Sequence, residues 1–390
     1  IYATGVANND LTWESTRVLN LGVDFGLFGD RLTGSVDAYD KYTDGILYTP
    51  TISTLNGLAT APRRNIAEVD NKGIEIELGW KNTTSSGFFY SVKGNFSYNR
   101  NRVAKYKGKL EQGMDSDGNW VSTGGSTRVL EGHEIGEWYL PTVYHGNGSH
   151  NGPEGGPIDG MIRTNEDLKW VKDMMAQGYR FQPFNAIGKN QIYYGDYIYA
   201  DNNGDKIFGS SYDSKFLGCS TTPKYNFGLQ ATAAYKGFDF TMNWGGSAGF
   251  KTYYYRIGLN SASTITPYSI GREIGYDHYF FDPDNPGDPR TNLTSKNPRI
   301  VNAGSSTTQN TYTSEHYLFK GDFLKLRNLT LGYTLPQTIT RKFYVEKLRV
   351  FASGDNLFSF DSFPGQDPEQ RTTISYSTIR RYAFGVNVTF

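Results

Sequence analysis

The last nine residues of the chain alternate between apolar side chains and small or polar ones without a break. One register holds Tyr382, Phe384, Val386, Val388 and Phe390, and the other holds Ala383, Gly385, Asn387 and Thr389. This period of two predicts a β-strand with one apolar face. Such a strand would invite aggregation at the end of a soluble domain, whereas outer-membrane barrels place one strand face in lipid and the other in a polar lumen. The ending therefore indicates a membrane barrel.

The same alternation recurs along the chain. Its apolar registers run through residues 19–27, 74–80, 88–98, 225–235 and 238–244. None of these registers contains a charged side chain. That matters because a Lys or Arg that faces lipid at the bilayer midplane costs roughly 2–4 kcal/mol. We therefore expect these registers to contact hydrocarbon.

Composition fits a barrel better than a soluble core. Only 37% of the residues are hydrophobic, but a barrel strand shows lipid only alternate residues, so its average hydrophobicity is low. Tyr (29), Phe (24) and Gly (45) are abundant, which suits aromatic girdles and closely paired strands. The 39 basic and 39 acidic residues cancel and give no support for a nucleic-acid partner. The single Cys219 excludes an internal disulfide framework.

The lengths of the connections set the number of strands. Outer-membrane barrels keep short turns in the periplasm and long loops outside. On this basis we predict nine antiparallel strands, near residues 13–28, 31–47, 67–81, 88–105, 224–235, 238–250, 317–334, 347–358 and 379–390. The strands at 317–334 and 347–358 alternate poorly, and in the first of them apolar residues fall on both faces, so we expect a bulge or a buried end there.

The odd strand number also bears on completeness. Single-chain bacterial barrels have even numbers of strands, and residue 1 opens no secretory signal peptide. We therefore expect the chain to be the C-terminal part of a larger all-β, transmembrane antiparallel barrel.

Several short motifs, taken in order, carry a family resemblance. They are LTWE at 11–14, NLGVDF at 20–25, NKGIE at 71–75, KGFD at 236–239, RNLTLGY at 327–333, DNLF at 355–358 and DPE at 367–369. With these motifs the chain resembles the SusC/RagA family of TonB-dependent outer-membrane transporters. The resemblance implies a 22-stranded barrel with an N-terminal plug, of which residues 1–390 would be the last nine strands. The plug and the TonB-contacting segment would lie outside this chain.

The resemblance also implies a function and partners. The family imports oligosaccharides or peptides through the bacterial outer membrane with energy passed on by TonB, and a SusD-like surface lipoprotein caps the barrel. We expect no catalytic residue, since the GGSAG run at 245–249 fits a hydrolase pattern but opens no helix. Two alternatives stay open: a non-transporting barrel such as an adhesin or assembly scaffold, and a soluble all-β carbohydrate-binding protein or hydrolase.

One segment has the spacing of a calcium loop. Asp201, Asn203 and Asp205 place side-chain oxygens at alternate positions, as the opening of an EF-hand-like loop does. The sequence lacks the expected Gly after Asp205, and Tyr212 stands where the closing acid belongs, with Asp213 one place later. The alternative is a turn held by side-chain to backbone hydrogen bonds. Ca²⁺ is therefore a possible ligand.

The long connection at residues 107–223 is predicted to be an extracellular loop region. It contains the aromatic residues Trp120, Trp138, Tyr139 and Tyr144 among Gly, Asn and Asp. Aromatic faces beside hydrogen-bonding groups suit sugar rings or peptide backbones, so these four are candidate substrate-binding residues. The alternative is that they form the core of the loop itself or contact the lipoprotein. Within this region, residues 163–177 have helical periodicity.

Overall fold

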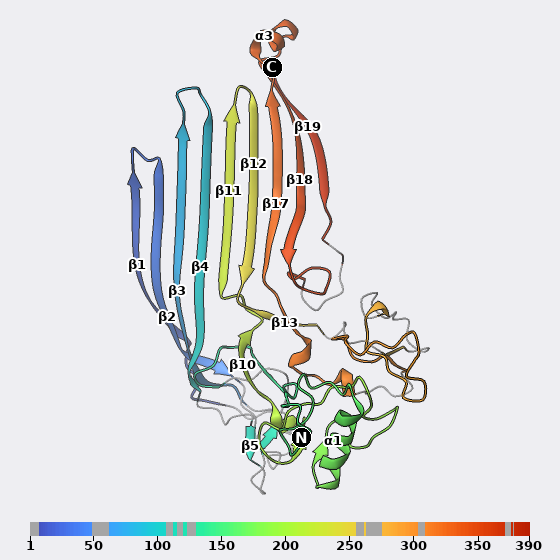
Figure 1. Ribbon diagram of the computed structural model, residues 1–390. Coiled ribbons are helices and arrows are strands. Elements are labelled where there is room, and N and C mark those ends of the chain that lie inside the picture. The colour runs from blue at the N-terminus through green and yellow to red at the C-terminus, as the bar shows by residue number, and fades with distance from the viewer. Residues whose placement is uncertain are drawn as a thin grey trace, which may run out of the picture.

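The computed structural model describes residues 8–48, 62–106, 112–114, 120–122, 130–254, 261–262, 275–302, 309–370, 376 and 378–390. Its main element is one antiparallel sheet in the order β1-β2-β3-β4-β11-β12-β17-β18-β19 (Figure 1). The strands are β1 (Ser15–Leu27), β2 (Leu32–Tyr48), β3 (Arg64–Thr83), β4 (Phe89–Tyr106), β11 (Tyr225–Tyr235), β12 (Phe238–Ala248), β17 (Phe323–Thr334), β18 (Lys347–Asp361) and β19 (Arg381–Thr389). The nine predicted strands are confirmed, and within the described residues the sheet ends at β1 and β19.

The strand register separates two faces of the sheet. Val36, Ile76, Phe96 and Phe227 stand side by side across β2, β3, β4 and β11, and we call their side the apolar face. The next row holds Asp37, Glu75, Ser97 and Asn226, and we call this side the polar face. The apolar face is bare in this chain: the side chain of Phe384 on β19 is 84% exposed. The predicted alternation is confirmed.

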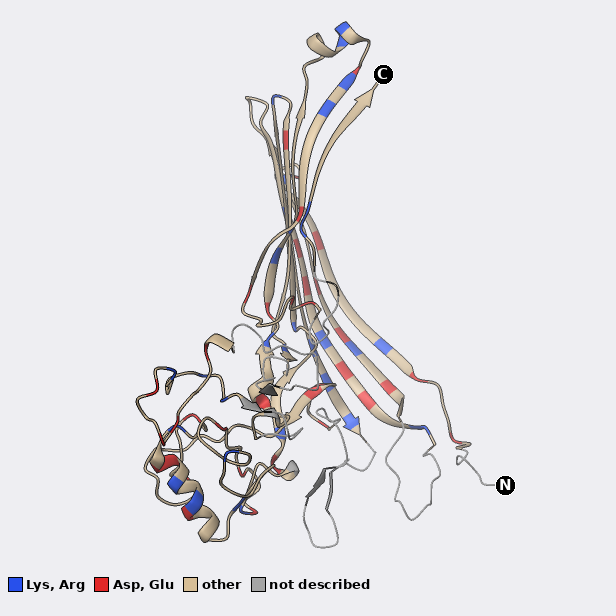
Figure 2. Cartoon of the chain, turned by 90° about the vertical axis from the view of Figure 1, so that its right-hand side faces the viewer, with Lys and Arg blue, Asp and Glu red and all other residues tan. Residues whose placement is uncertain are grey.

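The apolar face has the height of a membrane. Tyr225 and Tyr235 stand at the two ends of β11. At about 3.4 Å per residue and a tilt of about 40°, that strand spans roughly 26 Å along the barrel axis, close to the ~25 Å apolar band of outer-membrane barrels. Aromatic side chains gather at both ends, where Tyr225 stacks on Tyr98 at 5.2 Å and Tyr235 meets Phe88 at 6.1 Å. Figure 2 shows few charges in the half of the sheet near the C-terminus and many toward the loops.

The expected irregularity in residues 317–334 is a bulge with a buried end. A separate short strand, β16 (Leu318–Lys320), pairs with β13 (Lys251–Tyr253), and β17 starts only at Phe323. The register of β17 shifts between Leu326 and Asn328 against β18, and against β12 at the same place, so Arg327 is an extra residue. On the N-terminal side of the bulge, Lys325 lies opposite Gly245 on the polar face; with an unbroken register, Leu326 would take that place.

The long connections gather at one end of the sheet, opposite the short turns and α3 (Gln337–Thr340) (Figure 1). We call the described residues 130–224 and 275–317 the loop module. Its elements are β7 (Glu137–Leu140) paired with β10 (Lys215–Ser220), β8 (Arg180–Phe181) paired with β9 (Ile207–Phe208), and the helix α1 (Asn165–Ala176). Four further short strands form two pairs, β5 (Gln112–Met114) with β6 (Trp120–Ser122) and β14 (Ser261–Ala262) with β15 (Val301–Asn302).

The loop module has its own hydrophobic core, which explains why it folds. Trp170 and Val171 of α1 pack with Phe181, Phe208 and the distant Tyr279. The helix begins at a capping box, in which Thr164 accepts a hydrogen bond from the Asp167 amide and Asp167 accepts one from the Thr164 amide. The predicted helix is therefore confirmed. Among the described residues, no helix has the length and apolar character needed to cross a bilayer.

Candidate functional site

Two of the four aromatic candidates are buried in the loop module. Trp138 is 8% exposed, and its indole nitrogen donates to the carbonyl of Lys251 at 3.0 Å. Tyr144 is 6% exposed, stacks on Trp170 with ring centroids 5.3 Å apart, and donates to the carbonyl of Pro153 at 2.8 Å. These contacts favour the alternative that both residues belong to the core of the loop.

The other two candidates differ from this pair. Tyr139 is half-buried and meets the ring of Phe216 edge-on at 5.0 Å. Trp120 lies in β6, and its side chain is outside the described part of the chain. Substrate binding by these four residues stays a prediction, and among the three described side chains Tyr139 is half-buried whereas the other two are buried.

A polar pocket of about 450 Å³ opens beside Tyr144. Its charged and ionisable lining residues are His145, Glu154, Asp201, Lys215 and Glu315. They come from four separate stretches of the chain, which the core of the loop module brings together. Nothing in the sequence indicates that Glu315 would join this group, since it lies 100 or more positions from the others. Its carboxylate accepts a hydrogen bond from the Val143 amide at 3.1 Å.

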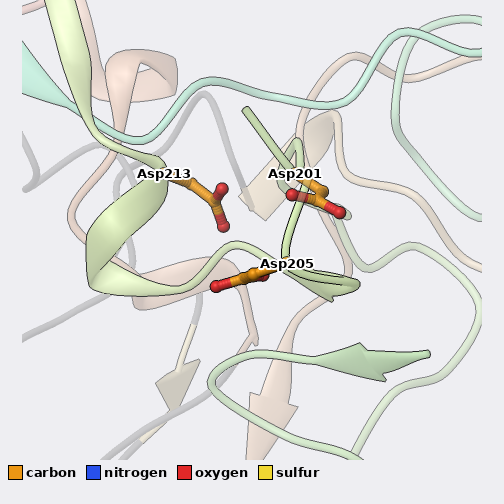
Figure 3. Close-up of side chains that lie close together, drawn as sticks. All are labelled: Asp201, Asp205 and Asp213. Carbon is orange, nitrogen blue, oxygen red and sulfur yellow. The ribbon is translucent and has the colours of Figure 1, made fainter. Parts of the chain in front are cut away.

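Three carboxylates converge next to this pocket. Oxygen atoms of Asp201, Asp205 and Asp213 lie within 4.8 Å of one another, and Figure 3 shows the three side chains turned toward one space. Asp213 ends a short 3₁₀ turn, Ser211–Asp213, that brings its carboxylate against the Asp201 loop. This set of hard oxygen donors fits Ca²⁺.

Both departures from the calcium-loop pattern are accommodated by the backbone. Lys206 stands where Gly was expected, and it adopts the left-handed φ of 69° that a Gly would adopt there more easily. The acid that should close the loop at position 212 is instead Asp213, which the 3₁₀ turn carries inward. Asn203 braces the loop, because its side-chain oxygen accepts the Asp205 amide at 2.9 Å and its side-chain amide donates to Asp205 at 3.0 Å.

Asp213 is the member of the cluster whose carboxylate is buried and whose pKa is raised. Its carboxylate is fully buried and accepts hydrogen bonds from the amides of Asn202 and Ser210, each at 2.7 Å. Burial, with a smaller contribution from the negative charge of Asp201, raises the pKa of Asp213 from 3.8 to about 6. Asp201 in turn accepts the amides of Gly204 and Lys206. Were Ca²⁺ to bind, Asp201, Asp205 and Asp213 would hold it, and its charge would relieve the repulsion between them.

The polar face of the sheet forms a second hollow, of about 560 Å³. Asp37, Glu75 and Glu77 line it together with Asn95 and Asn226. Lys93 of β4 pairs with Glu77 at 2.7 Å. This surface is acidic and hydrogen-bonding, as the wall of an aqueous channel is.

Comparison with known proteins agrees with this geometry. Residues 1–143 match the family described as TonB dependent receptor-like, beta-barrel. TonB-dependent receptor P3 of Formosa agariphila is 27% identical across the whole chain, and TonB-dependent receptor SusC of Bacteroides thetaiotaomicron is 25% identical over 98% of it. The solved RagAB peptide transporter has the same fold, with a TM-score of 0.67 over 99% of this chain at 20% identity. The chain is thus similar in sequence to TonB-dependent receptors such as SusC, and similar in fold to the RagAB transporter.

The chain is part of an outer-membrane protein, and it spans about a third of the length of the relatives that it matches. It covers 35% of receptor P3, 32% of SusC and 36% of the RagAB transporter chain. In such a barrel the apolar face meets lipid and the polar face lines the lumen. No lumen residues were named from the sequence. The polar registers of the strands, which include Glu75 and Glu77, could have predicted them.

Proposed function

We propose that the receptor containing this chain imports oligosaccharides or peptides across the outer membrane. The observation that carries the proposal is the division of one nine-stranded sheet into an apolar and a polar face. In a membrane barrel a sheet of this kind encloses a lumen that water-soluble cargo can enter, whereas in a soluble protein another layer would have to cover the apolar face. The acidic and amide groups of the polar face offer hydrogen bonds to either class of cargo.

The proposal includes energy from TonB and a SusD-like lipoprotein that covers the loop module. The names of the relatives support it, since one is the TonB-dependent receptor SusC and another structure is that of a peptide transporter, RagAB. The position of the loop module supports it as well, because long loops of outer-membrane barrels face outward and can meet a surface partner (Figure 1).

Uptake by the native bacterium tests the proposal. Cells that lack the full-length receptor should lose growth on one defined glycan or peptide mixture, and the wild-type gene should restore it. A strain without TonB should show the same loss, because the energy source is gone. Unchanged growth and unchanged uptake of labelled cargo in both strains would instead identify a non-transporting barrel.

We also propose calcium binding by Asp201, Asp205 and Asp213. The convergence of Asp213 on the other two carboxylates favours it, because a sequence spacing alone would leave the third acid outside the loop. A bound cation would stiffen the rim of the polar pocket beside Tyr144. This function is independent of the cargo.

A further inference from the structure

The connection that follows β18 folds back onto the barrel wall. Residues 362–370 come directly after Asp361, the last residue of β18, and we call them the strap. Three of its residues are buried, Phe363, Asp367 and Pro368, and Asp367 is only 5% exposed. Phe363 meets the ring of Tyr254 edge-on at 5.2 Å. A surface loop rarely buries a carboxylate, so the surroundings of Asp367 call for a physical reason.

The bulge in β17 supplies the partner of Asp367. Because Arg327 is an extra residue, the strand changes face at that point, and Lys325 lies opposite Gly245 on the polar face. Lys325 is 4% exposed. Without the bulge, Leu326 would occupy this row and Lys325 would point toward lipid. The bulge thus aims a buried cation at the lumen, in agreement with the way bulges redirect side chains elsewhere.

Four charges join the strap to β17. The Lys325 ammonium contacts Asp367 at 2.5 Å and Glu369 at 2.7 Å. The Arg327 guanidinium donates to the same Glu369 at 2.7 Å. Asp367 also accepts hydrogen bonds from the Thr378 hydroxyl and from the Glu369 amide. Two cations on the wall therefore match two anions on the strap.

The contacts also explain why the two carboxylates of the strap, Asp367 and Glu369, stay ionised. Burial acts to raise the pKa of Asp367, but hydrogen bonds from Lys325, Thr378 and the Glu369 amide outweigh it, so the pKa lies below its ordinary value. The Arg327 contact, with Lys325, lowers the pKa of Glu369 as well. A buried ion pair that loses one partner leaves the other charge stranded, which is strongly unfavourable. Asp367 therefore stays in place only while Lys325 is there.

We propose that residues 362–370 are an internal strap, latched by Lys325 and Arg327 to the lumen face of β17, which narrows the lumen beside the loop module. The DPE motif at 367–369 is the strap's half of the latch. Lys325 and Arg327 are positioning residues, since they act on the strap and not on cargo. The proposal rests on the polar face being the lumen and does not depend on which nutrient is imported.

Hydrogen exchange of the full-length receptor in micelles tests the latch. Lys325→Met should speed amide exchange of the peptide covering 362–370 by about tenfold or more, because the stranded Asp367 favours the open strap. Peptides from β3 and β4 should exchange as in the wild type. Lys325→Arg, and the exchanged pair Lys325→Asp with Asp367→Lys, should restore slow exchange.

Two further variants keep the test decisive. Arg349→Met breaks another ion pair of the polar face, with Asp239 at 2.5 Å, and should leave the strap peptide unchanged. Glu369→Gln removes only the more exposed half of the latch and should give a smaller acceleration in a normally folded barrel. Unchanged exchange in Lys325→Met, or equal acceleration in Arg349→Met, would overturn the proposal.

Discussion

At the scale of single residues, Gly332 explains part of the RNLTLGY motif. Asp239 of β12 and Arg349 of β18 lie on either side of β17 and pair across Gly332, with Arg349 Nε 2.9 Å from the carboxylate. A Cβ built on Gly332 would lie 2.5 Å from Asp239 Oδ1 and 2.5 Å from Arg349 Nη2. The glycine of the motif therefore leaves space for an ion pair that links β12 and β18 across β17.

Gly332→Ala should destabilise the barrel by about 1–3 kcal/mol, since the added methyl overpacks this contact. Gly94→Ala is the matched control, because its Cβ would meet nothing closer than 3.7 Å. The free energy of unfolding of the full-length receptor can be measured by equilibrium denaturation in micelles, with the heat-modifiable gel band as readout. Equal stability of the two variants would show that Asp239 and Arg349 adapt freely.

The carboxylate cluster gives a prediction with a pH dependence. Ca²⁺ should slow proteolysis of the Asp201 loop at pH 7, and Asp213→Asn should weaken binding by about tenfold or more, since one anionic ligand is lost. Asp284→Asn, on an exposed acid of the same module, should bind as the wild type does. Equal protection of both variants would place the cation elsewhere.

The sign of the pH effect follows from the raised pKa of Asp213. Its protonated form contributes stability that is complete below pH 3.8 and is lost as the pH rises through about 6. Protons and Ca²⁺ compete for the same carboxylate. Calcium affinity should therefore fall between pH 7 and pH 5, and a calorimetric titration that found tighter binding at pH 5 would contradict this assignment.

At the scale of elements, one buried ion pair joins the two halves of the loop module. Asp196 is fully buried, and Arg299 contacts it through Nε at 2.7 Å and Nη2 at 2.8 Å. Asn310 donates to the same carboxylate at 2.7 Å. Burial raises the pKa of Asp196, and Arg299 acts against this effect. The connection between β4 and β11 is thereby tied to the connection between β12 and β17.

Arg299→Gln should open this tie at a cost of about 3–5 kcal/mol, because it strands the buried Asp196. Amide exchange around residues 192–199 and 297–302 should speed up together. Arg290→Gln is the control: Arg290 pairs with Asp288 in the same segment, but its side chain is 71% exposed, so little change is expected. Exchange that rises in only one of the two segments would mean that they fold separately.

The strands could be predicted from the sequence and the loop contacts could not, for a physical reason. Alternation is a local signal, and it placed β3 and β19 because one face of each must stay apolar. The poor alternation of 317–334 even marked the bulge at Arg327. Asp213 beside Asp201, and Lys325 beside Asp367, depend on how long connections fold. The calcium-loop spacing placed Asp213 one position past the closing acid, and no spacing joins Lys325 to Asp367.

At the scale of the whole molecule, the chain consists of the nine-stranded sheet, which forms the barrel wall, and the loop module, which forms the rim at one end of that wall. The wall has an apolar band about as high as the hydrocarbon layer, with aromatic side chains at both ends, and its other face is polar. The rim is the loop module, which holds a polar pocket, a carboxylate cluster and a core of its own. The strap packs against the wall through Lys325 and Arg327 and against the ring of Tyr254. The import proposal and the strap proposal both require that the apolar face meet lipid.

Site-directed spin labelling of β3 tests that requirement most directly. In a full-length receptor with Cys219→Ser and with any cysteine outside this chain also replaced, reconstituted in bilayers, cysteine would replace residues 74–80 one at a time and carry a nitroxide. We predict high collision rates with oxygen at Ile74, Ile76, Leu78 and Trp80, and higher collision rates with a water-soluble nickel chelate at Glu75, Glu77 and Gly79. The opposite periodicity, or none, would contradict the assignment of the two faces.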